Sequence, residues 1–99
     1  MINKTVLIRS YASGVHYGTL VSEQFTPAGK VVVLRNSKRV WCWSGSASLS
    51  QLAMEGVKNA KGTKITMPVD EIEVVNVVET IPLSDAAIEN LNSMAVWKM

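Results

Sequence analysis

The chain has 99 residues, of which 47% are hydrophobic, and its ten Lys and Arg against eight Asp and Glu give a net charge of +2. This length predicts a single domain over residues 1–99, because domains usually take about 100 to 200 residues. The small, interspersed charge argues against nucleic-acid binding, and the lack of a long apolar run or signal-peptide pattern argues against a membrane partner or export.

The first predicted elements are two strands that form a hairpin. Residues 5–11 are rich in β-branched and aromatic side chains, and extended character resumes over residues 15–22 after a short connection at Gly14. Such a short connection favours antiparallel pairing. Gly18, inside the second strand, indicates either a bulge or a close approach by another backbone or a ligand, and we favour the bulge.

Two further strands complete a predicted four-stranded meander. A loop at residues 25–29 leads into an apolar strand over residues 30–35. Asn36 and Ser37 are typical turn residues, so we expect them to reverse the chain into a separate strand over residues 39–44.

The residues after this meander predict a short helix. Ser48 and Gln51 fit a capping box at its start, and Gly56 suits its C-terminal cap. The side chains that share a helical face are apolar: Leu49, Leu52 and Ala53.

The last predicted elements are two extended segments and a second helix. Residues 65–67 and 71–78 have strand character, and Pro68 interrupts the sequence between them. Ser84 can cap a helix whose inward side chains are Ala87, Ile88 and Leu91.

These elements predict a small α+β domain. Its mostly antiparallel sheet would have five or six strands curled into an SH3-like half barrel, with two short helices over one side or end. An open sheet with helices on one face is the alternative, since the pattern does not fix the strand order. The apolar strands would leave an apolar face or edge uncovered in so small a domain, so we also expect a homo-oligomer.

The sequence contains no recognisable catalytic or metal-binding motif. The one histidine, His16, and the one cysteine, Cys42, cannot build a Cys/His metal cluster or an intramolecular disulfide. No nucleophile-elbow spacing surrounds the serines, and the glycines form neither a P-loop nor a dinucleotide fingerprint. We therefore expect a protein that is not an enzyme, needs no metal or cofactor, and works in a reducing cytosol.

The run over residues 39–45 holds one arginine and two of the three tryptophans. Because side chains alternate along a strand, Arg39, Trp41 and Trp43 would share one face, while Cys42 would be a small buried side chain on the other. The shared face predicts a stacking platform for a planar base, with the guanidinium pairing to phosphate. An ordinary core strand carrying one solvated charge is the alternative.

Several segments carry a family resemblance in chain order. They are the strand at 14–20, the run Val40-Trp41-Cys42-Trp43-Ser44, the helix at 49–56, the segment at 68–72 and the terminal tryptophan. Together they resemble a family of small uncharacterised proteins from tailed phages and prophages, whose members often carry tyrosine where this chain has Cys42. The resemblance implies a phage origin and a host-cytoplasm setting, and it brings no catalytic residue.

A phage origin favours a binding role. We hypothesise a non-enzymatic phage protein that sequesters a nucleotide-derived immune signal, such as a cyclic nucleotide or an ADP-ribose derivative, in a pocket between subunits to counter bacterial defence. The candidate ligand-binding residues supply aromatic faces, phosphate contacts and hydrogen bonds: Arg39, Trp41, Trp43, Tyr17, His16, Arg9 and Ser44. The alternative is a protein-interaction module that inhibits or adapts a host protein, with Trp43 and Trp97 as hot spots. We otherwise expect Trp97 to anchor the C-terminal tail.

Overall fold

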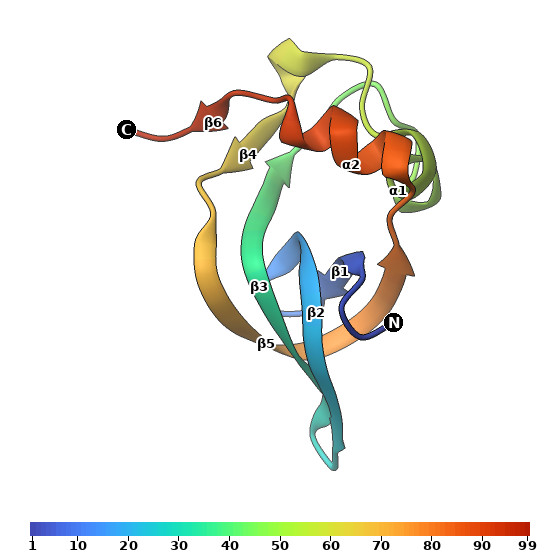
Figure 1. The fold of residues 1–99 in the computed structure, drawn as a ribbon, viewed down its shortest axis with the longest axis vertical. Helices are drawn as coiled ribbons and strands as arrows, with labels where there is room; N and C mark the ends of the chain where they lie inside the picture. Colours follow the sequence, from blue (N-terminus) through green and yellow to red (C-terminus); the bar gives the residue numbers. More distant parts are fainter.

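The computed structural model describes residues 1–99, which form one six-stranded sheet and two α-helices (Figure 1). The fold is α+β with a mostly antiparallel sheet, so the predicted class is confirmed. The elements in chain order are β1 (Thr5–Ser10), β2 (Gly14–Thr26), β3 (Gly29–Cys42), α1 (Leu49–Glu55), the 3-10 turn η1 (Ala60–Gly62), β4 (Lys64–Thr66), β5 (Val69–Pro82), α2 (Asp85–Asn92) and β6 (Val96–Trp97).

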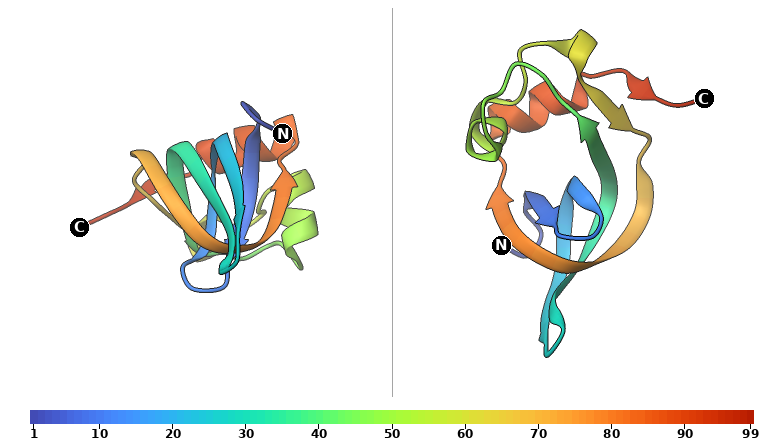
Figure 2. Two further views of the ribbon diagram at one scale, coloured as in Figure 1. Left: turned by 90° about the horizontal axis from the view of Figure 1, so that it is seen from below. Right: turned by 180° about the vertical axis from the view of Figure 1, so that it is seen from behind.

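The sheet is curled rather than flat. Its strand order is β2-β1-β5-β3-β4-β6, and β2 also pairs with β3. β1 and β3 therefore each pair with both β2 and β5, and all of these pairings are antiparallel. β5 sweeps in a long arc, and the helices lie at the opposite end of the molecule from the tip of the β2–β3 hairpin (Figures 1 and 2).

Alternation along the strands gives the sheet two apolar faces. One face packs against both helices through a cluster that includes Leu7, Tyr17 and Val40 from the sheet and Leu52 and Leu91 from the helices. The other cluster fills the space between β1, β2, β3 and β5 and consists of Val6, Ile8, Leu20, Val32, Leu34, Val74 and Val77. We call this second cluster the inner core.

The predicted turn at Asn36 and Ser37 is wrong, because β3 continues unbroken through these residues. Asn36 has a φ of 50°, and the β2–β3 register shifts so that Asn36 and Ser37 together oppose Gly18. Two residues opposing one is a β-bulge, as favoured for Gly18. A Cβ at Gly18 would lie 2.9 Å from the backbone oxygen of Arg35, so the glycine also permits the close approach of β3. The meander consequently has three strands, not four.

The helix boundaries follow their predicted caps. The Ser48 hydroxyl accepts a hydrogen bond from the Gln51 amide at 3.1 Å, and the Ser84 hydroxyl accepts one from the Ala87 amide at 3.0 Å. Gly56 ends α1 with a φ of 76°. Neither helix has the length and apolar character needed to cross a membrane.

The last strand brings the C-terminal tail against the sheet. β6 was not predicted, because its two residues carry no strand pattern of their own. It pairs in parallel with β4, so Val96 lies opposite Ile65 and Trp97 opposite Thr66. This pairing makes the sheet mixed and fixes Trp97 beside the β4–β5 connection.

Candidate functional site

The inner core becomes polar at the end of β2 and β3 where His16 and Arg39 lie. His16 opposes Ile8 on β1 and Arg39 on β3, and directly opposed residues share a face of the sheet. Since Ile8 belongs to the inner core, His16 and Arg39 continue that apolar interior with side chains that can hydrogen-bond.

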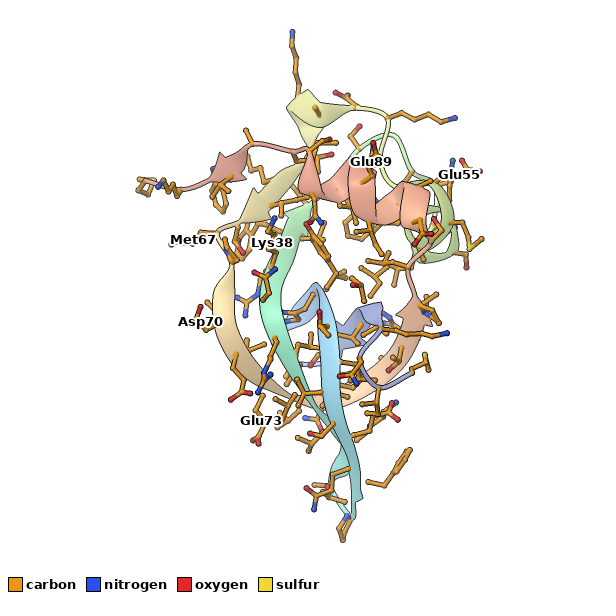
Figure 3. The ribbon with its side chains drawn as sticks, viewed as in Figure 1. Lys38, Glu55, Met67, Asp70, Glu73 and Glu89 are labelled. Carbon is orange, nitrogen blue, oxygen red and sulfur yellow. The ribbon has the colours of Figure 1, made fainter.

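A cavity of about 290 Å³ lies at this polar end, and we call it the donor cavity. Its lining comes from β2, β3, the end of β4 and the start of β5: His16, Ser37, Lys38, Arg39, Thr66, Met67, Val69 and Ile72. Lys38 on β3 and Met67 at the β4–β5 connection mark the region in Figure 3. No carboxylate lines the cavity, so its charge is positive.

Arg39 supplies that charge. The Lys38 ammonium is directed elsewhere, since it lies 3.5 Å from the Asn92 side-chain oxygen and 5.9 Å from the centre of the Tyr17 ring. The three salt bridges of the chain join Arg9 to Glu79, Lys30 to Glu23, and Arg35 to Glu71, and none involves Arg39. The half-buried Arg39 guanidinium therefore has no carboxylate partner.

Two buried polar atoms in residues that line the donor cavity have no hydrogen-bond partner in the protein. They are Ser37 Oγ and Arg39 Nε, and the Ser37 residue is only 2% exposed. The backbone amide of Arg39 is satisfied, because it donates to Thr66 Oγ1 at 3.0 Å. Native proteins pair most buried polar groups, so an unpaired buried donor beside a cavity indicates a place for an acceptor.

The surroundings of His16 favour its neutral form. Its Nε2 lies 3.1 Å from the carbonyl oxygen of Ser13 and 3.2 Å from the Ser13 hydroxyl. A carbonyl can only accept, so Nε2 carries the proton and donates it to Ser13. Burial, and secondly the positive charge of Arg39, lower the pKa of His16 below its usual 6.5.

Arg39 also lines a second cavity, of about 350 Å³, which we call the tryptophan cavity. Trp41 and the β1–β2 turn form most of its wall, and the lining residues are Ala12, Ser13, Gly14, Val15, Arg39, Val40 and Trp41. Trp41 is 60% exposed, and its ring stacks on Trp97 with 5.9 Å between centroids and 27° between planes. Arg39 thus joins a polar cavity to an exposed aromatic pair, Trp41 and Trp97.

The stacking platform expected from Arg39, Trp41 and Trp43 does not form. β3 ends at Cys42, and Trp43 turns away to pack, half-buried, against the cluster beneath the helices. Trp41 stacks on Trp97 instead. Cys42 is exposed, so its predicted burial is wrong. Its pairing with β4 is displaced by a register shift next to Val40, which ends the regular alternation there.

Three other candidate residues lie outside both cavities. Tyr17 is buried against the helices, donates its hydroxyl to the Asn92 side chain at 3.0 Å, and has a pKa raised to about 12 by that burial. The Arg9 guanidinium is paired with Glu79 at 2.7 Å. The amide of Ser44 donates to Thr63 Oγ1 at 3.2 Å and so belongs to the loop structure.

Ser37, Thr66 and Met67 line the donor cavity but are not among the candidate residues that the sequence indicates. Ser37 lies in the polar stretch Arg35-Asn36-Ser37-Lys38-Arg39, which has the composition of a turn, so no local signal marks it as a cavity residue. Thr66 and Met67 reach the cavity only because β4 and β5 both pair with β3, and no local pattern reveals that arrangement. Nowhere do three His, Cys, Asp or Glu side chains gather in a way that could hold a metal ion.

Comparison with known proteins places the chain in a family. The family model described as a domain of unknown function, DUF6948, matches residues 3–91. The chain belongs to this family. The DUF6948 match spans every residue that lines the two cavities, whereas Trp97 lies beyond it. No curated protein and no solved structure matches the chain.

Proposed function

We propose that this DUF6948 protein binds a small nucleotide-like ligand and holds it without chemical conversion. The observation that carries the proposal is the position of Arg39, which lacks a carboxylate partner and lines both the donor cavity and the tryptophan cavity. A guanidinium forms paired, charge-assisted hydrogen bonds with phosphate, and an exposed indole offers a face for a base. Arg39 and Trp41 bring both kinds of contact to one place.

The dimensions of the two cavities support a ligand of this kind. Small-molecule sites usually have volumes of about 300 to 1,000 Å³. The tryptophan cavity of about 350 Å³ falls at the lower end of that range, the donor cavity of about 290 Å³ lies just below it, and Arg39 borders both. A ligand with a phosphate at one end and a base at the other would use both cavities.

The geometry of His16 favours binding over acyl-transfer chemistry. Ser13 Oγ and His16 Nε2 lie 3.2 Å apart, which is the spacing of a nucleophile and its base. However, Nε2 already carries a proton, which it donates to the Ser13 carbonyl oxygen. It therefore cannot accept the proton of the Ser13 hydroxyl.

The resemblance to phage and prophage proteins supports a biological role for such binding. We propose a phage protein in the host cytoplasm that sequesters a nucleotide-derived immune signal, a cyclic nucleotide or an ADP-ribose derivative, to counter bacterial defence. A homo-oligomer would deepen shallow cavities by placing a second subunit over them. Sequestration requires only tight capture, which a non-catalytic pocket provides.

Calorimetric titration against cyclic dinucleotides and ADP-ribose isomers tests the proposal. Wild type should bind at least one member of the panel. Arg39→Gln should weaken that binding by about tenfold or more, because it removes a charge-assisted hydrogen bond to the ligand. Arg35→Gln is the matched control, because Arg35 is exposed on the same strand and lies 3.7 Å from Glu71. Absence of heat and of thermal stabilisation across the whole panel would refute the proposal.

A second candidate function is supported by the exposed apolar residues near β6. Trp41, Trp97 and Met67 are all exposed, and aromatic residues and methionine are enriched in protein interfaces. In this role the protein would inhibit or adapt a host protein. A host protein that co-purifies with wild type and Arg39→Gln, but not with Trp41→Ala, would favour this function over nucleotide binding.

A further inference from the structure

We propose that the donor cavity is an oxyanion subsite, built to take one tetrahedral phosphate group. The source is either a phosphate of the nucleotide-like ligand or free inorganic phosphate. The first source rests on the proposed function, whereas the second does not depend on it. Four residues from three strands form the subsite: His16, Ser37, Arg39 and Thr66.

The first observation is that hydrogen-bond donors converge without an acceptor. Ser37 and Arg39 both line this cavity, and Ser37 Oγ and Arg39 Nε are buried without a protein partner. Thr66 Oγ1 accepts the Arg39 amide at 3.0 Å, which leaves the hydroxyl hydrogen of Thr66 free to be donated. The residues that line the cavity therefore supply two hydroxyls and a guanidinium, and a phosphate oxygen accepts from both types of donor.

The second observation is that the donor cavity carries a positive charge between apolar walls. Arg39 lines the cavity, no carboxylate does, and the Lys38 ammonium lies 3.5 Å from the Asn92 side-chain oxygen. The remaining walls are apolar and come from Met67, Val69 and Ile72. Apolar walls keep the local dielectric low, so the attraction between a guanidinium and an anion is stronger there than in open water.

The third observation is the position of the β-bulge. The bulge places Asn36 and Ser37 opposite Gly18, and this shift sets Ser37 and Arg39 on the same cavity wall. The bulge is itself allowed by Gly18, since a Cβ there would collide with the backbone of β3. Bulges commonly re-aim side chains beside binding sites, and here the re-aimed side chain is the buried serine.

His16 provides a probe of the same subsite. The pKa of His16 is lowered by burial and by the positive charge of Arg39, which is the one charged group that affects it. A phosphate that neutralises Arg39 should therefore raise the pKa of His16 on binding. Because the chain contains one histidine, its imidazole signals in an NMR titration need no assignment.

The test measures thermal stability and calorimetric binding with inorganic phosphate, at constant ionic strength set with chloride. Phosphate also stabilises proteins nonspecifically, so the variants decide the outcome. Wild type and Arg35→Gln should show the same saturable stabilisation, while Arg39→Gln and Ser37→Ala should lose the saturable part. Equal stabilisation of all four proteins, or none in wild type, would overturn the subsite.

Ser37→Ala separates a binding role from a structural role. Removing a buried hydroxyl that has no protein partner should leave the ligand-free protein as stable as wild type or slightly more stable. Loss of phosphate binding with unchanged stability would support the subsite. Loss of stability with unchanged phosphate binding would contradict it. Thr66→Ser, which keeps the hydroxyl, should retain binding.

The subsite and the proposed function fail in different ways. Phosphate binding without any response to the nucleotide panel would retain the subsite and reject the nucleotide-binding function. Nucleotide binding that Ser37→Ala leaves unchanged would reject the subsite and retain the function. An unchanged pKa of His16 at saturating phosphate would place the anion elsewhere and would also reject the subsite.

Discussion

Replacement of Gly18 by alanine should destabilise the protein and disturb the bulge that carries Ser37. The added Cβ would lie 2.9 Å from the Arg35 carbonyl oxygen and 3.0 Å from the Ser37 Cα. Both atoms belong to the backbone of β3, so no flexible side chain can move aside. Either β2 and β3 separate locally or the bulge rearranges.

The expected cost follows from two opposing effects. Overpacking in a close-packed region costs about 1 to 3 kcal/mol, while alanine gains about 0.4 to 1 kcal/mol over glycine by restricting the unfolded chain. At the midpoints of the two ranges, the net loss is about 1.3 kcal/mol in the free energy of unfolding. For a domain of this size, each kcal/mol lowers the Tm by about 4 to 8 °C.

Urea and thermal unfolding, followed by tryptophan fluorescence, measure this loss. Gly29→Ala is a suitable control, because Gly29 has a φ of 128° and lies at the far tip of the β2–β3 hairpin. It should also lose stability through backbone strain, yet leave phosphate binding intact. A Gly18→Ala protein with wild-type stability and wild-type phosphate binding would refute this account of the bulge.

Three further predictions concern other contacts of the fold and site. Because burial and Arg39 lower the pKa of His16 in the folded protein, the unfolded chain binds the proton more readily, and stability should fall as the pH decreases below about 6.5. His16→Gln should reduce the dependence of Tm on pH between about pH 7 and pH 5.5, and an unchanged dependence would contradict this expectation. Trp97→Ala should lower the free energy of unfolding by about 0.5 to 1.5 kcal/mol, and it should shift the Trp41 fluorescence to the red because the Trp41 ring loses its stacking partner. An unshifted spectrum would mean that the aromatic pair does not form in solution. Asn90→Ala should cost about 1 to 3 kcal/mol in urea unfolding, because the Asn90 side chain accepts from the Val57 amide at 2.8 Å and donates to the Val57 carbonyl at 2.9 Å. A loss no larger than that of the exposed control Gln24→Ala would argue against this link between α2 and the residue that follows α1.

Local signals in the sequence were sufficient for the helices and the first hairpin. Ser48, Ser84 and Gly56 act through bonds or backbone angles within a few residues, so their roles can be deduced without knowledge of the fold. Gly18 also gave a correct prediction, since a glycine in a strand has few structural uses. The curled sheet followed from the number and apolar character of the strands.

The parts that could not be predicted depend on contacts between distant segments. The bulge at Asn36 and Ser37 has the composition of a turn, and only its pairing with β2 keeps the chain extended. The stacking of Trp41 on Trp97 requires the parallel pairing of β6 with β4, which no local pattern indicates. Alternation along a regular strand instead predicts that Trp41 shares a face with Trp43, two residues further along the chain.

Native mass spectrometry with the nucleotide panel tests the central claim most directly, because one spectrum reports both ligand stoichiometry and assembly state. Wild type and Arg35→Gln should each retain one ligand per chain, and Arg39→Gln, measured alongside them, should retain much less, as expected for an affinity weakened by about tenfold or more. A panel without any bound species, or equal occupancy in all three proteins, would contradict a ligand site organised around Arg39.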